Sequence, residues 1–274
     1  MNRVPLARRV QVINCLVEGN SIRSTERMTG THRDTICQLL VEVGGGCAKL
    51  MDEHMRDLPC RRIEVDEIWA YVGKKQRHMT PLDNPNRVGD QYTFVALDPE
   101  TKLVPSYFVG KRDLPTATAF LTDLSERLAN RVQLSSDALA AYVEAIEQAF
   151  GADVDYAQIV KIYEAEPIGP GRYSPPHVTG AQKLVIVGKP EWDNISTSLV
   201  ERQNLTMRMS MRRFTRLTNA FSKKVENLRA AVSLHFAHYN LVRVHRSLRV
   251  TPAMEARVSD RLWSLDELVE RTSN

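Results

Sequence analysis

The spacing of hydrophobic residues changes along this 274-residue chain, and that change limits the folds it can adopt. Between residues 6 and 43, apolar side chains recur every three to four positions, which predicts helices over about 6–16, 22–28 and 32–43. From Ile63 the period becomes two, which predicts strands over 63–72, 92–97 and 103–109. The chain therefore joins a small all-helical segment to a segment that forms a sheet.

Helices and one further strand follow the three strands. The pattern predicts a helix from Pro115, a strand over 132–134, a helix over 138–150 and helical structure from Ser198 onward. Short connections favour pairing of consecutive strands, and a helical crossover lets the fourth strand join in parallel. We therefore expect an α/β protein whose mixed sheet with flanking helices matches the RNase H-like architecture, preceded by a small all-α domain.

Composition excludes few classes, and charge alone names no partner. Lysine plus arginine (37) exceed aspartate plus glutamate (33) by four. No apolar stretch approaches the ~20 residues that span a bilayer, and Arg8 and Arg9 interrupt any signal-peptide core. The four cysteines include no Cys-x-x-Cys pair, so we expect reduced, mostly buried thiols in a soluble cytoplasmic protein without a membrane partner.

The first group of candidate site residues is Val65-Asp66-Glu67-Ile68-Trp69. Side chains alternate along a strand, so Glu64, Asp66 and Ile68 share one face. A carboxylate beside Ile68 would be half-buried and would need a cation or hydrogen-bond donors to compensate it. An edge strand with both faces in water fits the same residues.

Two further acids stand next to predicted helices. Asp137 follows a strand and precedes a helix, where an aspartate can simply cap the helix N-terminus. Glu201 fits a Ser-x-x-Glu capping box that begins at Ser198. Glu201 also begins a helix face that continues through Asn204, Arg208 and Arg212, which indicates a polar, charged partner opposite that face.

The three acids together are more informative than each alone. Asp66, Asp137 and Glu201 lie on the first strand, after the fourth strand and on a late helix, positions that can converge in an RNase H-like sheet. Converging carboxylates repel one another and need cations, and their oxygens select Mg²⁺ or Mn²⁺. We therefore expect two Mg²⁺ ions, which Mn²⁺ can replace, activating a water or a 3′-hydroxyl against a phosphodiester.

Positive charge is concentrated near the end of the chain. Residues 202–249 contain eleven Arg or Lys but one acid, Glu226. A solvated helix face normally mixes both signs, so this excess favours contact with a polyanion. The basic residues are Arg202, Arg208, Arg212, Arg213, Arg216, Lys223, Lys224, Arg229, Arg243, Arg246 and Arg249.

The N-terminal helices fit a helix-turn-helix whose turn contains Gly30. The third helix would then be a recognition helix, because its outward residues can hydrogen-bond phosphates and base edges. Small trihelical bundles also serve as protein docking units, so that alternative stays open. The outward residues are Thr31, His32, Arg33, Thr35 and Gln38.

Several segments resemble DDE transposases of the insertion-sequence-one type. They are Val65–Trp69, Ser136–Asp137 and above all Ser196–Arg208, followed by 213–224, 239–245 and 251–254, so the resemblance covers most of residues 21–255. The resemblance implies an N-terminal helix-turn-helix, an RNase H-like domain and an Asp-Asp-Glu metal site at Asp66, Asp137 and Glu201.

Two features depart from that family. Many relatives begin with a cysteine zinc finger, which this chain lacks, so recognition of element ends would rest on the three helices. Asp137 and Glu201 stand 64 positions apart (201 minus 137), far more than in the best-known member. Residues 166–191 hold five of the 13 prolines and four of the 13 glycines, which predicts an irregular insert. The insert could be a lid, a dimer contact or a DNA clamp.

The resemblance and the turn signals together predict a domain division. We expect a helix-turn-helix DNA-binding domain over 1–46, ended by Gly44-Gly45-Gly46, and a linker helix over 47–60. An RNase H-like DDE catalytic domain would cover 61–250, with the insert at about 151–195. A C-terminal helical tail would cover 251–274.

The expected function is a transposase that cleaves DNA at insertion-element ends and joins the 3′-hydroxyl to target DNA. Its partners would be double-stranded DNA at element ends and target, and a second copy in a homodimer or larger synaptic complex in the bacterial nucleoid. Asn204 and His245 would support the acids, although a lone histidine is more often structural. Alternatives are a catalytically inactive helix-turn-helix DNA-binding regulator and a cellular RNase H-like nuclease. Phosphates would be positioned by Arg202, Arg208, Arg212, Arg213, Lys223 and Lys224.

Overall fold

A six-stranded mixed sheet forms the centre of the protein. The computed structural model describes residues 4–163, 178–215 and 218–273. The strand order is β3-β2-β1-β4-β5-β6; β1, β4 and β5 run parallel, and β2, β3 and β6 run antiparallel to their neighbours. This confirms the predicted α/β, RNase H-like sheet. The strands are β1 (Arg62–Val72), β2 (Gly89–Leu97), β3 (Tyr107–Gly110), β4 (Val132–Asp137), β5 (Val154–Tyr163) and β6 (Val178–Val187).

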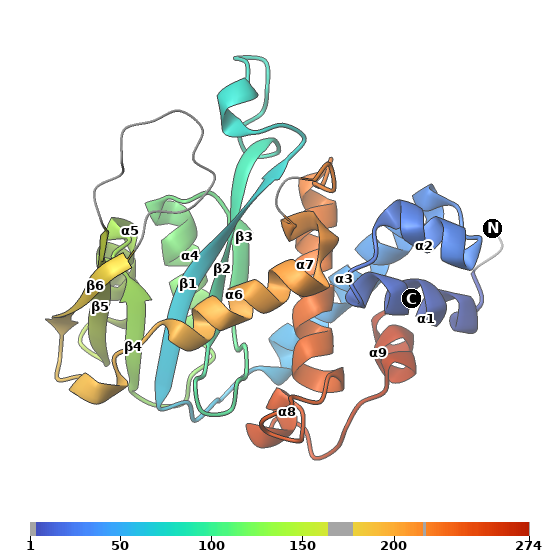
Figure 1. Ribbon diagram of the computed structural model, residues 1–274. Helices are drawn as coiled ribbons and strands as arrows, with labels where there is room; N and C mark the ends of the chain where they lie inside the picture. The colour runs from blue at the N-terminus through green and yellow to red at the C-terminus, as the bar shows by residue number, and fades with distance from the viewer. Residues whose placement is uncertain (1–3, 164–177, 216–217, 274) are drawn as a thin grey trace.

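Helices cover both faces of the sheet (Figure 1). On one face, Phe94 of β2 packs against Phe120 of α4 and Tyr142 of α5. The helix α6 crosses the opposite face over β1, and α7 packs against α3. The helices are α1 (Leu6–Val17), α2 (Ile22–Thr29), α3 (Arg33–His54), α4 (Leu114–Ser125), α5 (Ala140–Phe150), α6 (Ser198–Ser210), α7 (Val225–Ala237), α8 (Pro252–Glu255) and α9 (Leu265–Thr272).

The predicted break at Gly44-Gly45-Gly46 is wrong, because α3 runs through these residues to His54. Two of the glycines allow close helix packing instead. A Cβ on Gly44 would lie 2.3 Å from the backbone oxygen of Ala230 in α7, and one on Gly46 would lie 2.1 Å from that of Thr272 in α9. The glycines therefore bring three helix backbones together, an arrangement that sequence periodicity does not reveal.

The first and last helices lie side by side (Figure 1). The C-terminal α9 packs against both α1 and α3. Between α2 and α3, Gly30 adopts a left-handed conformation with φ of 66°, which forms the predicted tight turn. The division into domains stays a prediction.

Other elements differ from the predictions at their ends. The third strand covers 107–110 rather than 103–109, the fourth strand continues to Asp137, and the helix after it begins at Ala140. The predicted insert at about 151–195 is wrong for residues 154–163, which form β5 and pair with β4, and its predicted irregular part over 166–191 is wrong for residues 178–187, which form β6. Residues 164–177 lie outside the described residues. As an edge strand exposed on both faces, β6 has no alternating hydrophobic pattern to reveal it.

The cysteines behave as predicted. Cys15, Cys47 and Cys60 are buried, Cys37 is half-buried, and all four are free thiols. Burial raises the pKa of the Cys47 thiol to about 12, so it stays protonated. None of the helices in the described ranges is long and apolar enough to cross a bilayer.

The glycine packing gives a matched pair of substitutions. We expect Gly46→Ala to destabilise the protein by about 1–3 kcal/mol, because the added methyl meets the backbone of Thr272. Gly45 is exposed and a Cβ there meets nothing within 4 Å, so Gly45→Ala should stabilise α3 by up to ~1 kcal/mol. Thermal melts of both variants measure the difference. Equal melting temperatures would show that the helices do not need this close approach.

Candidate metal centre

Two of the predicted acids lie side by side at the end of β4. β1 and β4 pair in parallel with Val65 opposite Ser136, so the next residues, Asp66 and Asp137, are neighbours across the two strands. Side-chain oxygens of Asp66, Glu67 and Asp137 all lie within 4.8 Å of one another, and each residue is half-buried. Because β1 lies between β2 and β4, the edge-strand alternative is wrong.

The third predicted acid approaches from α6. Oε1 of Glu201 accepts a hydrogen bond from Nζ of Lys161 on β5 at 2.6 Å and another from the Thr197 hydroxyl at 2.8 Å. The charge of Glu201 also raises the pKa of Asp66, so the two carboxylates are electrostatic neighbours. Glu201 is therefore near Asp66 but outside the group of carboxylate oxygens within 4.8 Å, which Glu67 completes among the described residues.

A buried carboxylate fixes the position of α6. Oε2 of Glu64 accepts hydrogen bonds from the backbone N–H groups of Leu199 and Val200 at 2.8 and 2.9 Å, and Glu64 is 4% exposed. A negative charge at a helix N-terminus satisfies free N–H groups and interacts favourably with the helix dipole. One turn further on, Nδ2 of Asn204 donates to Oδ2 of Asp66 at 2.8 Å. These contacts hold α6 over β1.

Helix capping does not account for the positions of the acids. The N-cap residue of α5 is Leu139. Asp137 precedes the helix, and its Oδ1 accepts a hydrogen bond from the backbone N–H of Leu139 at 3.1 Å. The N-cap residue of α6 is Thr197 rather than Ser198. Glu201 reaches back to the Thr197 hydroxyl, so the predicted capping box starting at Ser198 does not form.

The acids at the end of β4 are poorly compensated. Burial, followed by the charge of Asp137, raises the pKa of Asp66 to about 6 and that of Glu67 to about 7. Arg112 opposes this, with Nε 2.6 Å from Oε1 of Glu67 and Nη2 3.8 Å from Oδ2 of Asp137. The Tyr142 hydroxyl donates to Glu67 at 3.1 Å. Crowded carboxylates repel one another when they ionise, and a hard divalent cation would relieve that repulsion by binding their oxygens.

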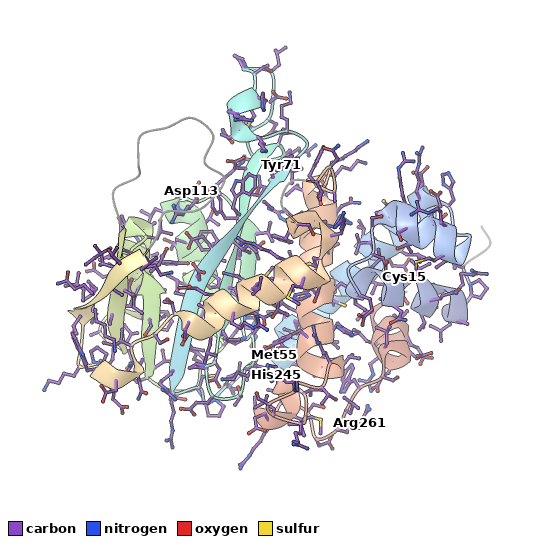
Figure 2. All side chains as sticks on the ribbon, in the orientation of Figure 1. Cys15, Met55, Tyr71, Asp113, His245 and Arg261 are labelled. Carbon is purple, nitrogen blue, oxygen red and sulfur yellow. The ribbon has the colours of Figure 1, made fainter. Side chains whose placement is uncertain are left out.

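The two predicted supporting residues differ in their contacts. Asn204 is buried and bonds Asp66 as described. His245 instead packs edge-on against Tyr239 and bonds the Ser247 hydroxyl, with Nδ1 and Oγ 3.0 Å apart. In Figure 2, His245 lies well below Tyr71, which is near the upper end of β1. The described contacts of His245 include none of the clustered acids, which favours a structural role.

The predicted DNA-binding residues belong to two stretches of the chain, the start of α3 and the region from α6 to Lys224. His32, Arg33 and Gln38 are exposed, and Thr31 and Thr35 half-buried, around the start of α3. Arg202 of α6 and Arg212, Lys223 and Lys224 after it are exposed, whereas Arg208 and Arg213 are half-buried. Arg216 lies outside the described residues.

Sequence reasoning missed four residues of this centre. Glu67 belongs to the recognised Val65–Trp69 motif, but strand alternation assigned it to the opposite face. Because β4 ends at Asp137, the longer Glu67 side chain still has an oxygen in the cluster. Glu64 was placed on the correct face without a role. Arg112 and Lys161 had no local signal, since the fold alone brings them to the acids.

Comparison with known proteins found similarity only to solved structures. No family model matches the chain, and no curated protein matches it. The Mos1 transposase paired-end complex with left transposon end is 15% identical, with a TM-score of 0.23 over 55% of this chain and 56% of that chain. The Mos1 strand transfer complex is 16% identical, with a TM-score of 0.22 over 54% and 55%. The chain therefore spans about half the length of these solved chains.

Proposed function

We propose that this protein is a transposase of the DDE kind, similar to the insertion-sequence-one type, that cleaves DNA at element ends and joins the 3′-hydroxyl to target DNA. The observation that carries the proposal is the grouping of Asp66, Glu67 and Asp137 within 4.8 Å at the end of β4. Glu201 lies near Asp66 on α6, which three hydrogen bonds with β1 hold in place. The sequence resemblance around Ser196–Arg208 supports the same function.

The acids would hold Mg²⁺, or Mn²⁺ in its place, with Asp66, Asp137 and Glu201 as the proposed ligands of two ions. When bound, these ions would make a water or a 3′-hydroxyl nucleophilic and stabilise the leaving oxygen. Glu67 offers a further carboxylate beside Asp137. Lys161 and Arg112 form ion pairs with three of the four acids, and both side chains can instead meet the phosphates of a DNA strand that enters the site.

DNA would be bound at two places. The exposed residues at the start of α3 would read element ends, and the cations of residues 202–224 would hold phosphates. A homodimer or larger complex would join two ends and a target. We place this chemistry in the bacterial nucleoid, with the insert between Asp137 and Glu201 as a clamp, lid or dimer contact.

A regulator that binds DNA without cutting it is the second candidate. The ion pairs of Lys161 with Glu201 and of Arg112 with Glu67 favour it, because they neutralise two of the acids without a metal ion. A cellular nuclease of RNase H-like fold would share the acids and differ in its DNA substrate.

The acids can be tested by charge removal. Asp66→Asn, Asp137→Asn and Glu201→Gln should each abolish Mg²⁺-dependent nicking and strand transfer on DNA with terminal inverted repeats, while DNA binding persists. The control is Asp155→Asn. Asp155 is an acid of β5 that lies outside the cluster and whose Oδ1 is 2.8 Å from Nη2 of Arg131. Wild-type cleavage by any of the three variants would remove that residue from the site, and inactivity of the wild type would favour the regulator.

The raised pKa values predict how stability depends on pH. Asp66 and Glu67 bind protons more tightly in the folded than in the unfolded chain. Protonation of these groups therefore stabilises the folded state between about pH 4 and 7. Without metal, the contribution of these groups to stability should fall as pH rises through this window. Melts of wild type and Asp66→Asn in EDTA should show a smaller fall in the variant. Parallel curves would contradict the crowding of charge.

Metal binding should restore the stability that the folded protein loses as pH rises. Millimolar Mn²⁺ should raise the melting temperature by a few degrees at pH 8 and by less at pH 5.5, where protons compete for Asp66 and Glu67. Asp137→Asn should lose most of the shift, while Asp155→Asn should keep it. Equal Mn²⁺ shifts in Asp137→Asn and wild type would mean that the metal binds elsewhere.

The two DNA-binding regions should respond differently. Arg33→Ala should weaken binding to element ends more than to random DNA, because recognition-helix side chains reach base edges. The control is Arg23→Ala, which removes another exposed arginine of the same helices. Combined alanine substitution of Arg212, Lys223 and Lys224 should weaken both alike and reduce the salt dependence of binding. Unchanged preference in Arg33→Ala would favour the protein-docking alternative.

A further inference from the structure

An aromatic row continues from the acids along β1. Glu67, Trp69 and Tyr71 alternate onto the same side of the strand. The ring centres of Trp69 and Tyr71 are 5.7 Å apart, and Tyr71 stacks on Phe221 at 4.7 Å. Two residues of a strand span about 7 Å, so this row begins directly beside the carboxylate cluster.

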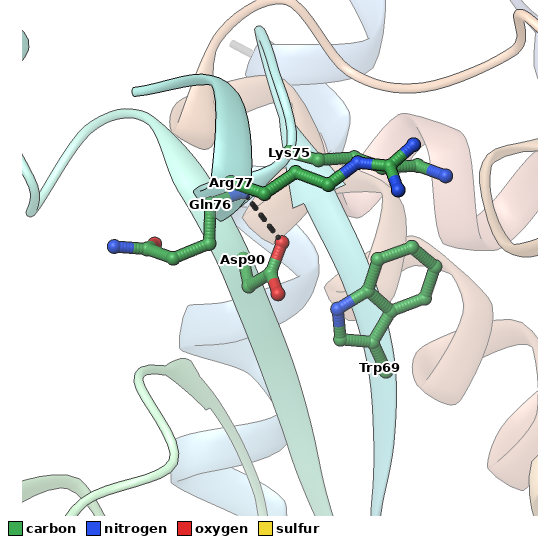
Figure 3. A pocket seen from close by; sticks show the side chains of 5 residues that line it. All are labelled: Trp69, Lys75, Gln76, Arg77 and Asp90. Carbon is green, nitrogen blue, oxygen red and sulfur yellow. Dashed lines mark hydrogen bonds between the residues drawn. The ribbon is translucent and has the colours of Figure 1, made fainter. Parts of the chain in front are cut away.

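Cations accompany these rings. Nζ of Lys75 lies 5.9 Å from the centre of the Trp69 ring and 5.8 Å from that of Tyr71. Figure 3 shows the side chains of Lys75 and Arg77 extending past the Trp69 ring. Asp90, the acid beside them, accepts the backbone N–H of Gln76 at 3.0 Å and so shapes the turn. The surroundings of Trp69 therefore combine aromatic surface with positive charge.

Two pockets meet at Trp69 and Lys75, which line both of them. Each has a volume of about 450 Å³, within the range of small-ligand sites. Gln76, Arg77 and Asp90 complete the first pocket (Figure 3). The second is also lined by aromatic, polar and basic side chains, among them Tyr71, Phe221, Asn219 and Arg213.

Arg213 shows which charge the second pocket favours. Its Nη1 donates to the Ser222 hydroxyl at 3.3 Å, and burial lowers the pKa of its guanidinium to about 10, so it remains charged at pH 7. No carboxylate of the described residues forms an ion pair with it. A half-buried cation whose only hydrogen-bond partner among the described side chains is a hydroxyl is partly desolvated, and an anion that entered the pocket would offset that cost. A phosphate matches the planar guanidinium in charge and hydrogen-bonding geometry.

We propose that this pocket binds an unpaired nucleotide of DNA, with its base against the Trp69 ring and its phosphate near Lys75 and Arg213. The inference rests on the proposed function, since it names the state of the DNA next to the acids. A base within a duplex has both faces covered by its neighbours, so only an unpaired base can stack on Trp69. A strand that reaches Glu67 would pass this pocket.

The test measures binding of labelled oligodeoxythymidylate by the full-length protein in EDTA, with fluorescence anisotropy as the readout. Trp69→Leu should weaken binding about tenfold, as expected for the loss of one base–aromatic stack, and Trp69→Phe should restore most of it. The matched control is Trp192→Leu. Trp192 is 57% exposed and lies 5.7 Å from Nζ of Lys183, so it is a similar aromatic–cation pair outside the pocket. Its loss should leave binding unchanged.

A second measurement does not depend on Trp69 variants. An oligodeoxythymidylate containing one 2-aminopurine should lose fluorescence on binding wild type, and Lys75→Gln should weaken this binding severalfold while the blunt duplex binds as before. Equal affinities of wild type and Trp69→Leu for the single strand, or equal losses for single strand and duplex, would overturn the proposal. Cleavage of duplex DNA with Mg²⁺ is scored separately, so failure of the pocket and failure of the transposase function give different results.

Discussion

The hydrogen bonds from the N-terminus of α6 to Glu64 are the interaction on which the candidate site depends. Glu64 is buried on β1, two residues before Asp66 and on the same face of the strand. It receives the N–H groups of Leu199 and Val200, so the start of α6 is tied to the strand that holds the first acid. Glu201 and Asn204 follow on this helix and are thereby brought toward Asp66. One buried carboxylate thus positions residues more than 130 positions away.

The cost of burying Glu64 explains why its partner is a helix end. A buried carboxylate is unfavourable without hydrogen bonds, and burial does raise the pKa of Glu64. Two backbone donors at a helix N-terminus lower that pKa again and supply partners that no side chain has to provide. The neighbouring acids have no such pair of helix-end donors among the described residues: Asp137 accepts one backbone N–H, from Leu139, and the group otherwise depends on Arg112, Lys161 and Asn204. The site is therefore built from one carboxylate held by two helix-end donors and several crowded carboxylates that repel one another, and the crowded ones gain most from a cation.

Sequence reasoning identified the acids better than it identified their surroundings. Asp66 and Asp137 were predicted to converge, and parallel pairing of β1 with β4 places them side by side. That pairing follows from strand order and a helical crossover, which periodicity can indicate. Alternation puts Glu67 on the opposite face of β1 from Asp66. It predicts the direction in which a side chain leaves the backbone but not the position of its end, so it does not predict that a carboxylate oxygen of Glu67 reaches the cluster at the end of β4. Arg112 and Lys161 could not be foreseen, since each comes from a distant element.

The amino-acid sequence by itself determined the alternation of helix-forming and strand-forming segments, the first four strands and the candidate acids, while β5 and β6 emerged only in the fold. The features that the sequence determined are local properties, set by hydrophobic spacing and side-chain chemistry. The tertiary structure decided the course of α3 through Gly44 and Gly46, because each glycine weakens a helix by about 1 kcal/mol and the close packing of α7 and α9 at these two positions offsets that cost. It also decided which cations meet which acids and which aromatic rings line the pocket beside them. Such contacts join residues far apart in the chain, and only the packed fold brings those residues within interaction distance.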